Sequence, residues 1–195
     1  MQIYKFLCKF APYINQLMNT MKFIGIIPAR YASTRFPAKP LAILGGKPVI
    51  QRVYEQVAGV LDDAYVATDD ERIESVVKSF GGKVVMTSVH HKSGTDRCYE
   101  AYQKVGEGYD VIVNIQGDEP FIQRSQLEAI KSCFEDETTQ IATLVKPFTV
   151  EDGFDALENG YTIKVGACDV ETIGIDTPED LERAEAFLKN HKEMR

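Results

Sequence analysis

Short apolar runs alternate with amphipathic stretches along most of the chain. The runs that we interpret as buried strands are Phe23–Ile27, Ala64–Ala67, Lys83–Met86, Val111–Ile115 and Ile141–Val145. Helical spacing of apolar residues predicts helices over Val49–Val57, Glu71–Phe80, Arg97–Val105 and Ser125–Phe134. A capping pattern at Thr177 predicts a last helix that ends at Asn190. Because strands that alternate with helices usually pair in parallel, we predict an α/β fold with a doubly wound, mostly parallel sheet.

The first twenty residues stand apart from this alternation. Residues 1–20 precede a second methionine, Met21, and we interpret them as a leader or extension before a single domain over residues 21–195. A secretory signal is the alternative interpretation. Lys9 and Pro12 interrupt its apolar stretch, which argues against a signal.

Composition excludes several classes of protein. The chain is 44% hydrophobic and 26% charged, as in ordinary globular proteins, and no apolar stretch is long enough to span a membrane. Its four cysteines are scattered, without a Cys-x-x-Cys pair. This spacing favours free thiols in a reducing compartment over a disulfide framework or a zinc site. We therefore expect a cytoplasmic protein with no membrane contact.

The net charge of −7 is unevenly distributed. Residues 1–54 contain eight Lys and Arg and no Asp or Glu, so all 29 acids lie after them. A basic arm that binds nucleic acid would explain this asymmetry. However, the cations are single and separated by apolar residues. This spacing favours a pocket for the phosphates of a small molecule, and we expect no nucleic-acid partner.

Three polar segments directly follow predicted strands: Pro28–Pro40, Thr68–Asp70 and Gln116–Pro120. Ligands of doubly wound sheets bind at the carboxyl ends of the strands, so we expect these segments to share one site. The first segment supplies Arg30, Arg35 and Lys39, which could surround a triphosphate. It matches neither the P-loop nor the dinucleotide-binding pattern, which disfavours a P-loop kinase and a dehydrogenase. A solvated loop with incidental cations is the alternative.

Five ordered motifs carry a resemblance to a known family. They are IIPARYASTRFPAKPL at residues 26–41, VATD at 66–69, SGTDR at 93–97, NIQGDEP at 114–120 and IGIDTPEDL at 173–181. The set resembles the CMP-Kdo synthetases, the 3-deoxy-manno-octulosonate cytidylyltransferases, from Met21 to about Lys189. A looser form of the first motif occurs in CMP-sialic acid synthetases, but the uninterrupted first run and the QGDEP block favour the Kdo family. The resemblance implies an α/β fold of the nucleotide-sugar nucleotidyltransferase type.

The resemblance also implies a reaction. CTP and Kdo would be the substrates, and CMP-Kdo and pyrophosphate the products, in lipopolysaccharide biosynthesis. By the family pattern, Arg30 and Lys39 would neutralise the phosphates with help from Arg35. The residues that would line or adjoin the nucleotide pocket are Ala29, Thr68, Asp69, Arg97 and Gln116. For Arg97, an ion pair on a helix surface is the alternative.

Asp118 and Asp176 match the magnesium-binding carboxylates of the family. Two carboxylates about 5 Å apart repel by roughly 3 kcal/mol at an effective dielectric constant of about 20, and Mg²⁺ between them converts this cost into attraction. Oxygen ligands and substrate phosphates suit Mg²⁺. We therefore expect Mg²⁺ as cofactor, with a role in orienting and polarising the α-phosphate. The alternatives are a strand-end turn at Asp118 and a helix entry at Asp176.

The family pattern breaks between Leu157 and Asn159. The family has there a long segment with a His-x-Gly-x-Tyr block and a Leu-Glu-Gln-Leu-Arg block, and neither block occurs in this chain. We interpret the break as a deletion near residues 157–159. In the family this segment contributes to the sugar-acid pocket and to the homodimer interface, so both are in doubt here. A catalytically impaired CTP-binding remnant and a CMP-sialic acid synthetase-like enzyme stay open as alternatives.

Overall fold

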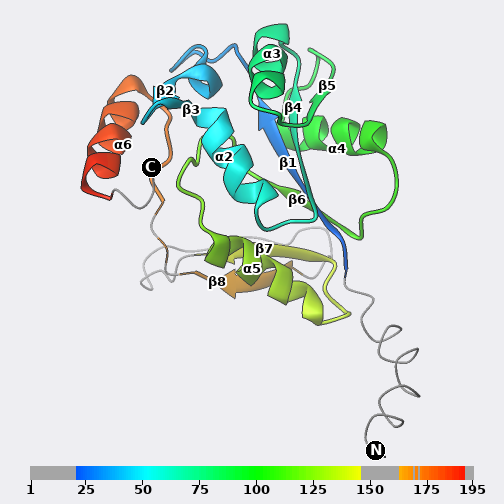
Figure 1. Ribbon diagram of the computed structural model, residues 1–195. Helices are drawn as coiled ribbons and strands as arrows, with labels where there is room; N and C mark the ends of the chain where they lie inside the picture. Colours follow the sequence, from blue (N-terminus) through cyan, green and yellow to red (C-terminus); the bar gives the residue numbers. More distant parts are fainter. Residues whose placement is uncertain (1–20, 146–162, 169, 171, 192–195) are drawn as a thin grey trace, which may run out of the picture.

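A four-stranded parallel sheet forms the centre of the protein, in a computed structural model that describes residues 21–145, 163–168, 170 and 172–191 (Figure 1). The strand order is β5-β4-β1-β6. The strands are β1 (Phe23–Ala29), β4 (Asp63–Thr68), β5 (Val84–Met86) and β6 (Val111–Asn114). All their pairings are parallel, which confirms the predicted α/β fold. Each of these strands contains its predicted apolar run apart from at most one terminal residue.

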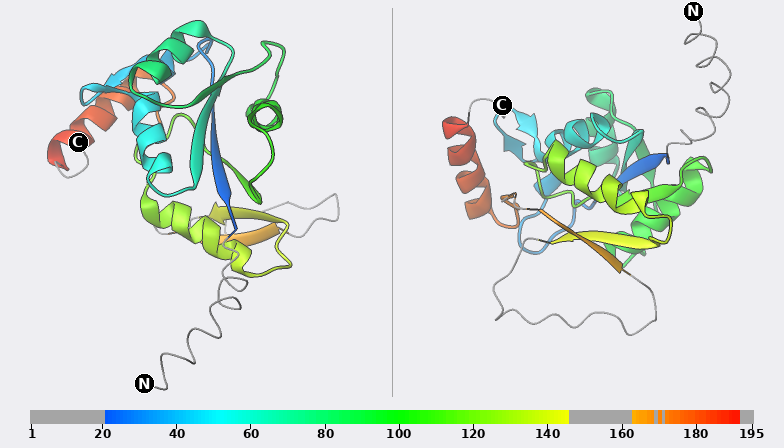
Figure 2. Two further views of the ribbon diagram at one scale, coloured as in Figure 1. Left: turned by 45° about the vertical axis from the view of Figure 1, so that its right-hand side comes forward. Right: turned by 90° about the horizontal axis from the view of Figure 1, so that it is seen from below.

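Helices cover both faces of this sheet (Figure 2). They are α2 (Val49–Ala58), α3 (Glu71–Ser79), α4 (Gly94–Val105) and α5 (Arg124–Ser132), with the 3₁₀ helix η2 (Cys133–Glu135) after α5. The alternation of side chains along β1 explains the two layers. Phe23 and Ile27 pack in a core cluster with α2, α3 and α5, whereas Ile24 and Ile26 pack against α4. Helix α4 begins three residues before its predicted start, because the Ser93 hydroxyl caps its N-terminus.

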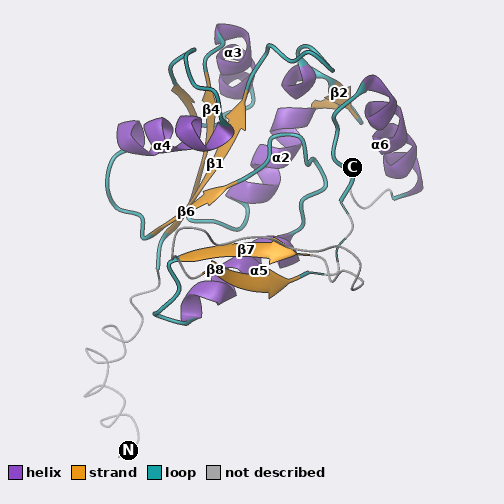
Figure 3. Ribbon diagram, turned by 180° about the vertical axis from the view of Figure 1, so that it is seen from behind, coloured by secondary structure: helices purple, strands orange, loops and turns teal. Residues whose placement is uncertain are grey.

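A second, two-stranded sheet lies beside α5 (Figure 3). It pairs β7 (Ile141–Val145) in parallel with β8 (Ile163–Ala167). The predicted strand over 141–145 is confirmed, but it pairs in this small sheet and not in the central one. Strand β8 was not predicted, since Lys164 and Gly166 interrupt its apolar character.

The C-terminal helix α6 (Pro178–Asn190) packs beside the loops that follow β1 and β6. It contacts β2 (Ile43–Leu44), which follows the 3₁₀ helix η1 (Lys39–Leu41) and forms a hairpin with β3 (Lys47–Pro48). Their shared buried cluster consists of Leu44, Val49, Phe121, Ile175, Ala184 and Leu188. This packing brings the segment before α6 to the carboxyl end of the central sheet.

Two predictions fall on residues that the structure does not describe. The leader over residues 1–20 and the deletion near 157–159 both lie outside the described residues, so they stay predictions. Within the described part of the chain, no helix combines the length and apolar character that crossing a membrane requires.

Candidate active site

The loop after β1 folds back on itself and ends in η1. The Ala38 backbone N–H donates to the Tyr31 carbonyl at 2.9 Å, and the Leu41 N–H donates to the Ala38 carbonyl at 2.8 Å. Ala38 has a φ of 57° and a ψ of 18°, which is the left-handed conformation that residues with a side chain rarely adopt. Backbone strain of this kind persists where the surroundings enforce it, and it is frequent at functional sites. The strained residue directly precedes Lys39.

Lys39 lies between the two predicted metal carboxylates. Its Nζ is 2.8 Å from Oδ2 of Asp118 and 3.1 Å from Oδ1 of Asp176. The Lys39 side chain is 16% exposed, against 30% for Asp118 and 44% for Asp176. The three groups come from the loop after β1, the end of β6 and the entry to α6. The structure therefore brings together the cation and the acidic pair that the sequence analysis placed in one site.

Hydrogen bonds fix the backbone that carries the two carboxylates. The Ile175 N–H donates to the Asp118 carbonyl at 2.8 Å, which joins the two acidic segments directly. The Asp176 N–H donates to Oδ2 of Asp180 at 2.9 Å. Hydrogen bonds from Arg183, and then from the Asp176 N–H, lower the pKa of Asp180 to about 2. Asp180 thus remains an anionic cap at neutral pH. The capping pattern at Thr177 indicated where the helix starts, but not that Asp180 holds the backbone of Asp176.

The two arginines of the loop differ in their surroundings. Arg35 Nη1 donates to Oδ2 of Asp176 at 3.1 Å, so this cation also reaches the acidic pair. Arg30 is exposed, and no hydrogen bond or ion pair joins it to another described residue. Its side chain is therefore available to an anion from solution.

Arg97 connects the carboxyl ends of β4 and β5. Its Nη2 is 2.9 Å from Oδ2 of Asp69, and its Nη1 donates to the Thr87 hydroxyl at 2.6 Å. Thr87 in turn donates to the Thr68 carbonyl at 3.0 Å. The Arg97 side chain is only 1% exposed. The alternative of an exposed ion pair on a helix surface is therefore wrong, and the guanidinium acts within the protein by holding Asp69.

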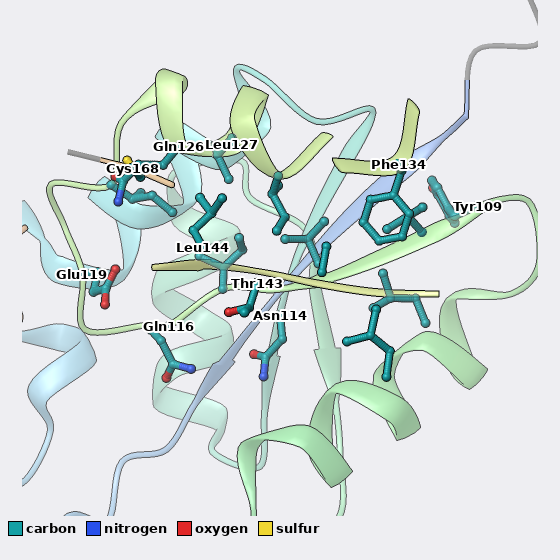
Figure 4. Close-up of a pocket in the computed structure, with 18 of the residues that line it drawn as sticks. Tyr109, Asn114, Gln116, Glu119, Gln126, Leu127, Phe134, Thr143, Leu144 and Cys168 are labelled. Carbon is teal, nitrogen blue, oxygen red and sulfur yellow. The ribbon is translucent and has the colours of Figure 1, made fainter. Parts of the chain in front are cut away.

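The remaining predicted pocket residues differ in exposure. Ala29 and Thr68 are buried, at 4% and 0% exposed, so in this structure their side chains face the interior. Gln116 is exposed and lines a cavity of about 1040 Å³ along the open edge of β6 (Figure 4). The cavity walls come from β6, α5 and β7, and Glu119 is also among the lining residues. Burial, and then the charge of Asp118, raise the pKa of Glu119. The roles of these residues toward a nucleotide stay predictions.

The donor set at Asp118 and Asp176 suits a hard divalent cation. Both carboxylates already direct an oxygen at one common cation, the Lys39 ammonium, so their oxygens converge on a single point. Carboxylate oxygens are preferred ligands of Mg²⁺, which completes its shell with water and substrate phosphates. Among the described residues, no group of three or more His, Cys, Asp and Glu could hold a metal. A cation here would therefore depend on two protein carboxylates and on oxygens from a ligand.

Comparisons with known proteins show the family to which the chain belongs. The family model described as cytidylyltransferase matches residues 24–159. This chain belongs to the cytidylyltransferase family.

Relatives of this cytidylyltransferase carry a more specific name. The 3-deoxy-manno-octulosonate cytidylyltransferase of Phocaeicola vulgatus is 58% identical over 250 residues, covering 88% of this chain and 99% of the relative. The protein of the same name from Bacteroides thetaiotaomicron is 55% identical over 248 residues, with 87% and 99% covered. Both alignments are longer than the 195 residues of this chain, so the relatives contain residues that this chain lacks.

Among solved structures, a CMP:2-keto-3-deoxy-manno-octonic acid synthetase complexed with CTP has a TM-score of 0.78 and 28% identity. The superposition covers 87% of this cytidylyltransferase and 99% of that chain. The resemblance that the five motifs indicated is therefore confirmed for both the family and the fold.

Gly117 permits a close approach of the loop after β6 to strand β1 in this cytidylyltransferase. A Cβ at this position would lie 2.8 Å from the Pro28 carbonyl oxygen and 3.5 Å from Cγ2 of Ile27. We expect Gly117→Ala to lower the free energy of unfolding by about 1–3 kcal/mol, because backbone must move to relieve the contact. Urea denaturation measures this change. Gly174→Ala is the matched control, since a Cβ there meets no described atom within 4 Å, and equal losses in both variants would contradict the prediction.

Proposed function

We propose that this chain is a 3-deoxy-manno-octulosonate cytidylyltransferase, which converts CTP and Kdo into CMP-Kdo and pyrophosphate. The observation that carries the proposal is the contact of Lys39 with Asp118 and Asp176 beside a basic loop. A transferase acting on a triphosphate needs cations for the phosphates and carboxylates for a metal, and this site has both. The two relatives above carry this name, and the CTP-bound synthetase has a similar fold.

The reaction exchanges one phosphorus–oxygen bond for another. The anomeric hydroxyl oxygen of Kdo forms a bond to the α-phosphorus of CTP, and the proton of that hydroxyl passes to solvent. The bond between the α-phosphorus and the oxygen that bridges to the β-phosphate breaks, and pyrophosphate leaves. Negative charge accumulates on the leaving group, so Lys39, Arg35 and Arg30 would stabilise it by neutralising the phosphates.

Mg²⁺ is the proposed cofactor. Asp118 and Asp176 would hold it, and when bound it would polarise the α-phosphate. Other residues of the site would orient the nucleotide. Asp69, held by Arg97, would adjoin the nucleotide together with the backbone of Ala29 and Thr68, and Gln116 would lie at the rim.

The proposal has a cellular and a structural part. Since CMP-Kdo serves lipopolysaccharide assembly, we propose a cytoplasmic enzyme with CTP and Kdo as its partners. Nucleic acid and membrane are not proposed partners, because the loop cations are dispersed and not clustered. We also propose that the homodimer of the family does not form, because this chain lacks residues that its relatives have.

A pyrophosphate-release assay with CTP, Kdo and Mg²⁺ tests the function. We expect release that requires both substrates, with sialic acid in place of Kdo as the control for sugar identity. No release over a broad range of enzyme concentrations would overturn the proposal. Calorimetry with CTP would then show whether the chain is a binding remnant, because a remnant would bind CTP without turnover.

A further inference from the structure

The Lys39 ammonium occupies the point at which the oxygens of Asp118 and Asp176 converge. It lies within 3.1 Å of both carboxylates, and its side chain is mostly buried. A divalent cation held by the same carboxylates would have to bind those oxygens at about 2.0–2.1 Å, as Mg²⁺ does. The ammonium and the metal carry like charges and need the same ligands. They cannot occupy this point together.

The lysine side chain is the part of the arrangement that can move. The two acidic segments are joined by the hydrogen bond from Ile175 N–H to the Asp118 carbonyl, and Asp180 holds the backbone of Asp176. Lys39, by contrast, reaches the acids through a flexible four-carbon stem with a rotatable ammonium. An incoming polyanion offers this ammonium an alternative partner, whereas the carboxylates have no comparable freedom.

We propose that Lys39 is the internal counter-ion of the Asp118–Asp176 pair, and that a divalent cation enters only as a triphosphate draws this ammonium away. This inference rests on the proposed function, because it assumes that the site takes a nucleoside triphosphate and a metal. Triphosphate and metal then bind cooperatively, since each favours the state in which Lys39 has left the acids. Such coupling is reciprocal. Binding of the metal before the triphosphate is therefore disfavoured.

Manganese binding in the absence of nucleotide tests the inference directly. Mn²⁺ alone is titrated into the full chain, and the free ion is quantified by electron paramagnetic resonance. We expect Lys39→Met to bind Mn²⁺ at least about tenfold more tightly than the wild type, within the range usual for coupling between two ligands. The gain should disappear in Lys39→Met combined with Asp118→Asn, because one of the vacated carboxylates is then neutral.

Arg30→Met is the matched control. It removes the same charge from the same loop, but Arg30 has no contact with either carboxylate among the described residues. We expect a much smaller gain in Mn²⁺ affinity from this variant. An equal gain in both variants would overturn the inference, since it would indicate general charge and not a displaced counter-ion. Unchanged or absent Mn²⁺ binding in folded Lys39→Met would overturn it as well.

The Mn²⁺ titration tests this inference separately from the proposed function. The titration contains no CTP, Kdo or turnover, so it reports only on the competition between Lys39 and a metal. A chain that releases pyrophosphate but shows no gain in Lys39→Met keeps its function and loses this inference. If Lys39→Met gains Mn²⁺ affinity but the wild type releases no pyrophosphate, Lys39 does compete with the metal and the proposed reaction does not occur. Circular dichroism of each variant confirms that the fold is retained.

Discussion

Asp118→Asn is expected to lower kcat for CMP-Kdo formation by about 100-fold or more, equivalent to about 2.7 kcal/mol of transition-state stabilisation. The amide keeps the size of the carboxylate but removes its charge, so it would hold Mg²⁺ poorly. Lys39 also loses an anionic partner at 2.8 Å. Steady-state kinetics with saturating CTP and Kdo measure the effect. A fall in kcat with little change in KM would place the lost interaction in the transition state.

Asp176→Asn and the double variant show whether the two acids act as a unit. Asp176 is more exposed than Asp118, and we expect a smaller loss from its replacement. If both carboxylates hold one cation, the double variant should lose little more than Asp118→Asn alone. Glu182→Gln, at an exposed position of α6, is the control for the loss of one negative charge. More than a tenth of wild-type kcat in Asp118→Asn would contradict the assignment.

The central sheet was predictable largely because its inner strands, β1 and β4, are mostly buried on both faces. Continuous apolar runs result, as in Phe23–Ile27, and the helices between them have clear spacing. Strand β8 has no such signal. A Cβ on Gly166 would lie 2.7 Å from Cδ2 of Leu144 and 3.1 Å from Sγ of Cys133, so tight packing there favours glycine over an apolar side chain. A strand with an exposed lysine and a closely packed glycine does not resemble a buried one.

The site was predictable only in outline. The position of polar segments after strands indicated that Lys39 and Asp118 would be neighbours, because parallel strands end at one edge. Only the family resemblance placed Asp176 with them. Their mutual arrangement depends on α6, which packs on the hairpin after η1 and is remote in sequence from both other segments. Sequence position alone could not show that Lys39 lies between the two acids. The sequence also did not show that Arg97 is buried, because arginine side chains are mostly exposed.

The buried ion pair of Arg97 gives the largest expected effect on stability. The guanidinium is almost wholly buried, and it bonds both Asp69 and Thr87. Arg97→Met preserves much of the side-chain volume but leaves the Asp69 carboxylate without its partner. We expect the free energy of unfolding to fall by about 3 kcal/mol, the lower end of the range for removing one member of a buried pair. The lower end applies because Asp69 is still 18% exposed.

A second feature also moderates this loss. The Nε atom of Arg97 is buried and has no hydrogen-bond partner among the described residues, so the wild type already carries one desolvated donor that Met would remove. Urea denaturation at neutral pH measures the difference. Lys78→Met is the control, because Lys78 pairs with Glu74 across one turn of α3 with 63% of its side chain exposed, and we expect a loss below about 1 kcal/mol. If Arg97→Met lost no more stability than Lys78→Met, the guanidinium would not be what holds Asp69 at the end of β4.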